Sequence, residues 1–333
     1  MKCILPVKDK NFSRLLVVLV VVFILSSILK PGLFLRGSNF ISMARQFPEF
    51  GIMAIGISFT MLTGGIDLST VYAANLSSII AAKTMLALAG DNVSGSAMAG
   101  ILVLSVGIAL FTGFLCGVLN GLLISKIGIP PILATLGTQQ LFWGIAIVIT
   151  SGKSISGLPM TYFIIGNIEL LGFIPISLVF FILVAAISSV ILSKTKFGTR
   201  LYLLGTNPVA AKFAGLKNDF LIIAAYAFSG FLAAISGLIM MASTNSTKAD
   251  YGSSYTMQCI LIAVMGGISP SGGRGNIKGV VVVILILQML SSVLNMFENI
   301  SNFYRDIIWG AALLGVMVLN YVIGTKKVKQ SKA

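Results

Sequence analysis

The chain has 333 residues, of which 57% are hydrophobic and only 10% are charged. Soluble domains carry about 25% charged residues, so this composition excludes an ordinary water-soluble protein and favours one membrane domain over residues 1–333. The chain has no histidine, and its three cysteines are widely spaced. These features exclude imidazole chemistry, a zinc pattern and a disulfide framework, so we expect no metal and no cofactor.

Apolar stretches long enough to cross a bilayer follow one another along the chain. Residues 1–29 resemble a signal peptide, but no small-residue cleavage site follows them, so we favour a retained span. Together the stretches predict an all-α polytopic membrane protein with broken helices. The ten predicted spans are roughly 15–29, 50–66, 71–89, 98–124, 133–149, 174–192, 220–242, 254–267, 280–294 and 307–323.

The net charge of +14 is unevenly distributed between the two predicted faces of the membrane. With ten spans, sixteen Lys and Arg residues fall on the face that holds both termini and six on the other. Positive charge concentrates in cytoplasmic loops, so we expect both termini to be cytoplasmic. Membrane topology therefore explains the charge better than nucleic-acid binding does.

The second span ends in "MLTGGIDLST", where an acid follows an uncharged run. Gly64 and Gly65 can end one helix, and Asp67 or Ser69 can cap the next, at the cytoplasmic end of the span. We interpret this as a helix break and candidate inner gate, with a plain capped break or a buried ion site as alternatives. The stretch "VMGGISPS" (264–271) echoes "LTGGIDLS" (62–69), which adds Gly266 and Gly267 to the candidate gate, unless the echo is chance.

Polar side chains within the spans are candidates for a translocation path. Thr135, Gln139 and Trp143 are spaced by four residues on the fifth span, and Asn75 lies in the third. Amides and hydroxyls beside an indole can hold a polyhydroxylated ligand. The alternative is hydrogen bonding between helices.

Small residues spaced by four predict close helix packing. The fourth span carries Gly113, Gly117 and Gly121, and the seventh carries Ser229, Ala233 and Gly237.

The largest predicted cytoplasmic loop, 193–219, contains the signals of a short helix. Asn207 is a good N-cap, Pro208 suits the first helical position, and Gly215 stops the helix. A helix of about seven residues is unstable alone and must dock on another surface. Its other residues are Val209, Ala210, Ala211, Lys212, Phe213 and Ala214.

No nucleotide-binding loop is evident in the sequence. The "GKS" at 152–154 has Ile147 where a P-loop needs glycine. If ATP drives this protein, another subunit must bind it.

The sequence resembles the permease subunits of ATP-binding-cassette importers of the ribose, xylose and autoinducer type. The resemblance rests on "GTNPVAAKFAGL" (205–216), "LTGGIDLS", the stretch 117–159 with "IPPILATLGT", and "AVMGGISPSGGRGNIKG" (263–279). These motifs follow in order over about 220 residues and together are specific. Thr70, Tyr72, Asn75 and Pro270 depart from the family's usual wording.

The resemblance implies a homodimer or a pair with a sister permease in a bacterial cell membrane. It also implies a cytoplasmic ATPase, with residues 207–215 as the coupling helix, and an extracytoplasmic sugar-binding protein. An ion-coupled secondary transporter is the alternative, but nearly all nine acids fall in predicted loops or at span ends. A membrane enzyme would need catalytic groups that the sequence lacks.

Overall fold

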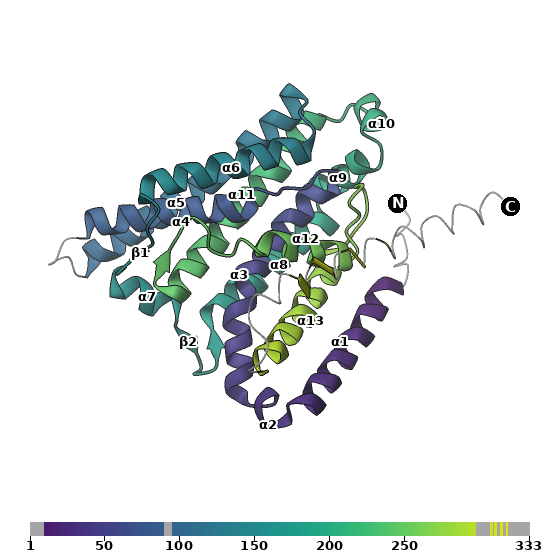
Figure 1. The fold of residues 1–333 in the computed structure, drawn as a ribbon. Coiled ribbons are helices and arrows are strands. Elements are labelled where there is room, and N and C mark those ends of the chain that lie inside the picture. The colour runs from purple at the N-terminus through teal and green to yellow at the C-terminus, as the bar shows by residue number, and fades with distance from the viewer. Residues whose placement is uncertain are drawn as a thin grey trace.

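The computed structural model describes residues 10–89, 95–297, 307, 308, 310, 311, 314, 315 and 318. The described part is almost entirely helical (Figure 1). Its helices are α1 (Lys10–Leu29), α2 (Pro31–Phe34), α3 (Gly37–Leu62), α4 (Thr70–Leu88), α5 (Ser96–Leu122), α6 (Pro131–Thr150), α7 (Met160–Gly166), α8 (Ile176–Lys194), α9 (Lys196–Thr206), α10 (Pro208–Phe213), α11 (Asn218–Thr244), α12 (Tyr255–Met265) and α13 (Ile277–Asn295). A π-helical turn, η1 (Leu123–Ile127), extends α5.

Two small antiparallel sheets complete the described structure. Strand β1 (Ile155–Ser156) pairs with β4 (Ser246–Thr247), and β2 (Glu169–Leu170) pairs with β3 (Ile174–Pro175). Both sheets lie with α7 at the end of the molecule opposite α10 (Figure 1). The predicted all-α class is therefore confirmed.

Nine of the ten predicted spans fall on described helices, namely α1, α3, α4, α5, α6, α8, α11, α12 and α13. Seven helices of the described part are long and apolar enough to cross a membrane, which excludes α3 and the 11-residue α12. The tenth predicted span, 307–323, lies mostly outside the described residues. The described helices are therefore those of a multi-pass membrane protein.

The predicted start of the second span was wrong. Helix α3 begins at Gly37 rather than near residue 50, and Pro48 lies inside it. Proline removes a helical hydrogen bond, so Pro48 beside the charged Arg45 and Glu49 disfavours a helix by local preference. Packing overrides this local preference, so Glu49 lies within the helix with only 8% of its surface exposed.

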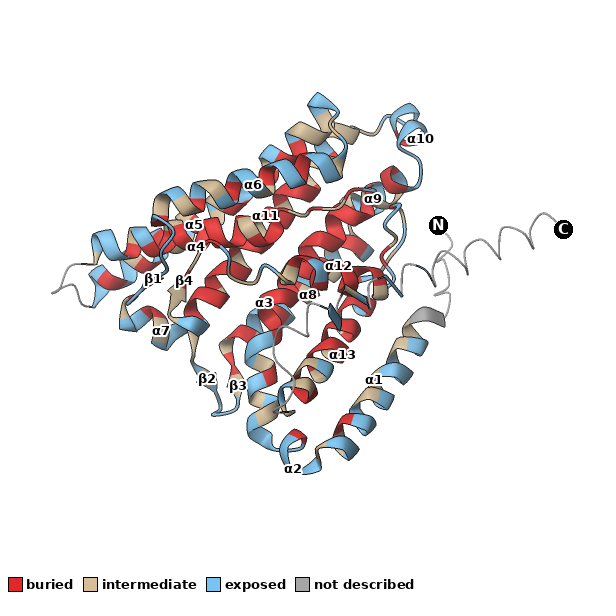
Figure 2. Cartoon of the chain, viewed as in Figure 1, coloured by how far each residue is buried: buried red, intermediate tan, exposed pale blue. Residues whose placement is uncertain are grey.

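Helix α3 is the centre of the core. Every residue from Phe47 to Leu62 is buried, which means that other helices surround it on all sides. Figure 2 shows the same burial along α3, α4, α11, α12 and α13, while α1 and the outer faces of α5, α6 and α8 are exposed. Their exposed apolar side chains suit contact with lipid.

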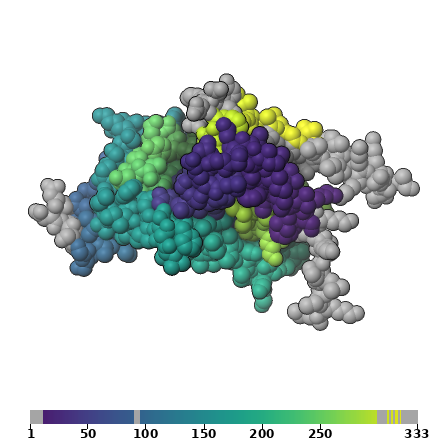
Figure 3. All heavy atoms as spheres, turned by 90° about the horizontal axis from the view of Figure 1, so that it is seen from below, coloured from purple at the N-terminus to yellow at the C-terminus, as the bar shows by residue number. Residues whose placement is uncertain are grey.

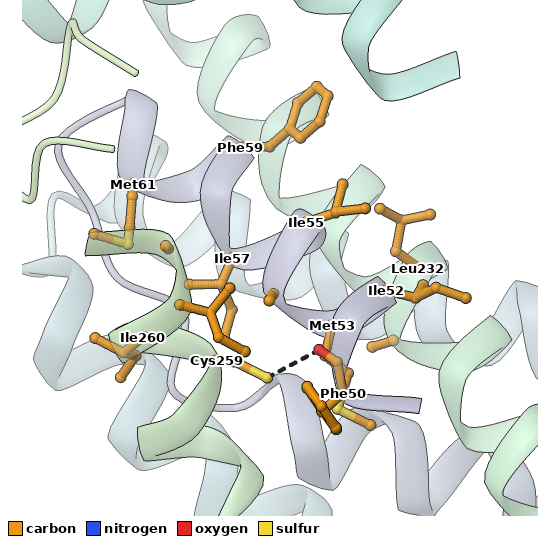
Figure 4. Packing of buried hydrophobic residues seen from close by; sticks show 14 of the residues in the cluster. Phe50, Ile52, Met53, Ile55, Ile57, Phe59, Met61, Leu232, Cys259 and Ile260 are labelled. Carbon is orange, nitrogen blue, oxygen red and sulfur yellow. Dashed lines mark hydrogen bonds between the residues drawn. The ribbon is translucent and has the colours of Figure 1, made fainter. Parts of the chain in front are cut away.

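The core around α3 is built from aliphatic, aromatic and sulfur-containing side chains (Figure 4). Ile55 and Ile57 of α3 share this cluster with Leu232 of α11 and Ile260 of α12. The Sγ atom of Cys259 donates a hydrogen bond to the Phe50 carbonyl over 3.2 Å. Cys259 is thus a packing residue that satisfies a backbone group.

Glycines bring α5 and α11 into backbone contact, as predicted. A Cβ atom built at Gly121 would lie 2.6 Å from Ile223 Cα, and one at Gly117 would overlap the Tyr226 carbonyl. Gly113 and Gly230 face each other across the same interface. Helix α11 also meets α4, where Gly237 packs on Ala74.

We expect Gly117→Ala to lower the thermal unfolding midpoint of the chain in detergent, because overpacking a tight contact costs about 1–3 kcal/mol. Gly107→Ala is the matched control, since Gly107 lies on the same helix and a Cβ atom there would have no neighbour within 4 Å. The control should be neutral or stabilising by about 0.5–1 kcal/mol. Equal midpoints for the two variants would contradict the close α5–α11 packing.

Candidate functional site

The break between α3 and α4 is the first candidate site. Helix α3 ends at Leu62 and α4 begins at Thr70, and Gly64 between them has a φ of +87°. This left-handed conformation favours glycine, so the predicted break at Gly64 and Gly65 is confirmed. Gly65 is tightly enclosed, because a Cβ there would lie 3.0 Å from Pro131 Cβ.

The Asp67 carboxylate in this break is buried, with 1% of the residue exposed. One oxygen accepts hydrogen bonds from Ser69 N over 3.1 Å and Ser69 Oγ over 2.7 Å. The other accepts from Ser229 Oγ of α11 over 3.0 Å. Among the described residues, Asp67 forms no ion pair, so neutral donors alone offset the cost of burying its carboxylate.

The hydrogen bonds continue from Ser69 into α5 and α6. Asn120 Nδ2 donates to Ser69 Oγ over 2.7 Å, and Thr138 Oγ1 donates to Asn120 Oδ1 over 2.6 Å. The one hydroxyl proton of Thr135 faces two acceptors, the Pro131 carbonyl of its own helix at 2.9 Å and the Ile66 carbonyl of the break at 3.1 Å. We call Asp67, Ser69, Asn120, Thr138 and Ser229 the carboxylate network. It joins the break to three helices, α5, α6 and α11.

Of the two caps predicted for the start of α4, only Asp67 bonds the backbone there, because its carboxylate accepts from Ser69 N. Ser69 occupies the N-cap position but its side chain makes no capping bond, because the hydroxyl is engaged by Asp67 and Asn120. Asp67 reaches Ser229, eleven residues beyond Asn218 at the start of α11. At 1.5 Å per residue this is about 16 Å along α11, so the Asp67 carboxylate in the α3–α4 break lies against the middle of α11.

The second break lies between α12 and α13 and, like the first, follows directly on the end of a core helix. Helix α12 ends at Met265, Gly267 has a φ of +93°, and α13 begins at Ile277. The two breaks touch, since Gly273 N donates to the Leu62 carbonyl over 3.0 Å. The two stretches that echo each other in sequence thus lie side by side, at the ends of α3 and α12.

The four predicted path residues are not brought together. Asn75 Nδ2 donates to the carbonyls of Ala249 (3.1 Å) and Tyr251 (2.9 Å), and Thr135 bonds across to the first break. These two side chains thus bond to backbone carbonyls of loops, which is close to the structural alternative, although neither bond joins two helices. Gln139 is half-buried and Trp143 is 39% exposed on the same helix, α6.

Helix α10 matches the predicted short helix closely. It spans Pro208–Phe213, Asn207 Oδ1 accepts from Ala210 N over 3.0 Å, and Gly215 has a φ of +77°. Figure 1 shows α10 at a tip of the molecule. Val209 is 64% exposed and Phe213 is 89% exposed, whereas Ala211 is buried.

Helix α10 is connected to both breaks. Asn218 Nδ2 at the start of α11 donates to the Pro208 carbonyl over 2.8 Å, and α11 carries Ser229 of the carboxylate network. On its other side, Tyr202 of α9 donates through its hydroxyl to the Gly275 carbonyl over 2.9 Å. Gly205 of α9 packs directly on Leu62 and on the Gly272–Gly273 backbone.

Several of these residues were not identified from the sequence. Asn120 and Thr138 were not predicted, and Ser229 was predicted only as a small packing residue, because their hydrogen-bond partners lie far away in the chain. Glu49 likewise accepts from Ser243 Oγ over 2.6 Å. The one signal in the sequence was a polar residue inside an apolar run. This signal indicates a buried polar group but does not identify its hydrogen-bond partner.

The geometry can be compared with known proteins. Residues 39–318 match the family described as "Branched-chain amino acid transport system / permease component". The chain belongs to this family. It is therefore a multi-pass membrane subunit of a transport system rather than an enzyme.

Individual relatives cover most of the chain. It is 35% identical over 305 residues to the ribose import permease protein RbsC of Bacillus subtilis (strain 168), covering 91% of this chain and 90% of that protein. It is 32% identical over 269 residues to the autoinducer 2 import system permease protein LsrC of Yersinia enterocolitica, covering 81% and 71%. No solved structure matches the chain significantly.

We expect Asp67→Asn to unfold at or above the wild-type temperature, because an amide can keep the Ser69 bonds and donate to Ser229 without burying a charge. Asp67→Ala should lower stability by about 1–3 kcal/mol, because it leaves buried hydroxyls without a partner. Thermal unfolding of the purified chain in detergent measures both. A stable Asp67→Ala variant would show that the network does not hold the break.

Proposed function

We propose that this chain is the transmembrane permease of an ATP-binding-cassette importer and forms the path for a sugar or sugar-like solute. The observation that carries the proposal is α10, a six-residue capped helix with an almost fully exposed Phe213. An exposed apolar side chain on so short a helix favours docking on a partner protein. The ribose and autoinducer 2 import permeases among the relatives support the substrate class.

The partners follow from this assignment. A cytoplasmic ATPase binds α10 and holds the ATP, so this chain itself needs no cofactor. An extracytoplasmic binding protein delivers the solute, and a second copy or a sister permease completes the path. Both termini then lie in the cytoplasm of a bacterial cell, in keeping with the bias of Lys and Arg toward that face.

The internal contacts suggest how ATP-driven movement reaches the membrane. A displacement of α10 pulls on α11 through Asn218 and on the two breaks through α9. We propose that the breaks form the inner gate, at Gly64, Gly65, Asp67 and Ser69 on one side and at Gly266 and Gly267 on the other. Asp67 acts as an anchor there, because both its oxygens already accept hydrogen bonds.

The solute path is proposed along α6. Gln139 and Trp143 offer an amide and an indole on its partly open face, while Thr135 and Asn75 support the path by holding α6 and α4 in place.

Co-expression with the cognate ATPase tests the proposal. The two proteins should co-purify, and solute uptake into vesicles should need ATP and the binding protein. A failure to form the complex, or uptake driven by an ion gradient without the ATPase, would contradict it. The second outcome would favour the ion-coupled transporter, for which Asp67 and Glu49 are the buried acids.

Two substitutions on α10 test its role within the complex. Ala210→Glu and Ala214→Glu should leave the chain in the membrane but reduce ATP-dependent uptake at least about tenfold, because a desolvated charge in the interface costs well over 1.4 kcal/mol. Ala210→Ser and Ala214→Ser are the controls, since they keep the side-chain size and add no charge. Full uptake by both Glu variants would show that α10 is not the docking element.

A further inference from the structure

A cavity of about 970 Å³ opens between α1, α9 and the segment 264–276, away from the carboxylate network. Helix α1 contributes Phe12, Arg14, Leu15 and Val18 to its wall, and α9 contributes Tyr202. The opposite wall includes Arg274 and the backbone of the second break. The cavity thus lies between the outermost helix and a loop of the core.

Among the described residues, no acidic side chain offsets the positive charge of this cavity. Arg14 and Arg274 line it, and no Asp or Glu stands among the described residues of its wall. The ion pairs within the described part of the chain, Arg45–Glu169, Lys126–Asp219 and Lys248–Asp250, involve neither arginine. A guanidinium offers five donors in a planar fork that matches the oxygens of a phosphate.

Three of the four side chains that α1 contributes to the cavity are apolar. Phe12, Leu15 and Val18 recur every three residues, which places them along one face of the helix. Only 6% of the span Phe12–Leu29 is buried in the protein, so lipid surrounds α1 over most of its length. In the space-filling view from below, the purple N-terminal segment lies in front of the yellow-green C-terminal helices (Figure 3).

We propose that the cavity binds an anionic phospholipid. The lipid phosphate pairs with Arg14 and Arg274 while an acyl chain follows Phe12, Leu15 and Val18 into the bilayer. Arg14 lies in the first turn of the span, the depth at which lipid headgroups occur. A soluble phosphate would use the two arginines but leave the apolar wall exposed.

The bound lipid links α1 to the second break. Among the long helices, α1 packs chiefly on α13 and otherwise stands apart from the bundle. A headgroup held by both arginines adds a contact between α1 and the loop that contains Gly266 and Gly267. This site does not depend on the proposed transport function.

Lipid titration of the purified full-length chain tests the site. Dioleoyl phosphatidylglycerol in mixed micelles should raise the unfolding midpoint and remain bound in native mass spectrometry, while dioleoyl phosphatidylcholine should do neither. Arg14→Gln and Arg274→Gln should each weaken phosphatidylglycerol binding about fivefold, the loss expected for one basic residue at a lipid surface. Arg200→Gln is the matched control, an exposed arginine of α9 that does not line the cavity.

Three results would overturn the proposal. Equal effects of the two lipids would show that no anion is selected, and equal losses in all three variants would show that the attraction is diffuse. Binding of glycerol 3-phosphate as tight as that of phosphatidylglycerol would assign the cavity to a soluble phosphate instead of a lipid.

Discussion

The fold depends on how one buried carboxylate is satisfied. Asp67 has no cationic partner in the described structure and cannot reach water, so each of its oxygens must accept hydrogen bonds from nearby donors. Ser229 supplies one and Ser69 supplies two, and these bonds fix the α3–α4 break against α11. Asn120 and Thr138 then extend the same constraint to α5 and α6. One side chain therefore links the break between α3 and α4 to three further helices, α5, α6 and α11.

The two helix breaks are in direct contact with each other. Leu62 at the end of α3 accepts from Gly273, and Gly205 of α9 packs between them at a distance that only glycine permits. A short helix, α10, sits beside this junction with its apolar face uncovered. The carboxylate network, the two adjoining breaks and the exposed helix α10 are therefore joined by a continuous set of contacts.

Local features of this protein were predictable from the sequence, and long-range ones were not. The start, cap and end of α10 are set by Asn207, Pro208 and Gly215 within a few residues of one another, and the structure has them in place. The start of α3 was missed because Pro48 and Glu49 disfavour a buried helix by local preference. Packing against the surrounding helices overrides that preference. The bond from Ser69 to Asp67 is local and was predicted, whereas the second partner of Asp67, Ser229, is 162 residues away and was not. The sequence could not decide whether Asn75 and Thr135 line a translocation path or make structural hydrogen bonds. Residue spacing shows which side chains share a helix face, and it does not show which groups they contact.

A double-mutant cycle between Asp67 and Ser229 tests the central claim most directly. The free energies of unfolding of Asp67→Ala, Ser229→Ala and the double variant would be measured on the chain in one detergent. If the carboxylate anchors the break through α11, the coupling energy should be about 1–3 kcal/mol, because removing the second partner costs little once the first is gone. Additive losses, with a coupling energy within about 0.5 kcal/mol of zero, would contradict the account.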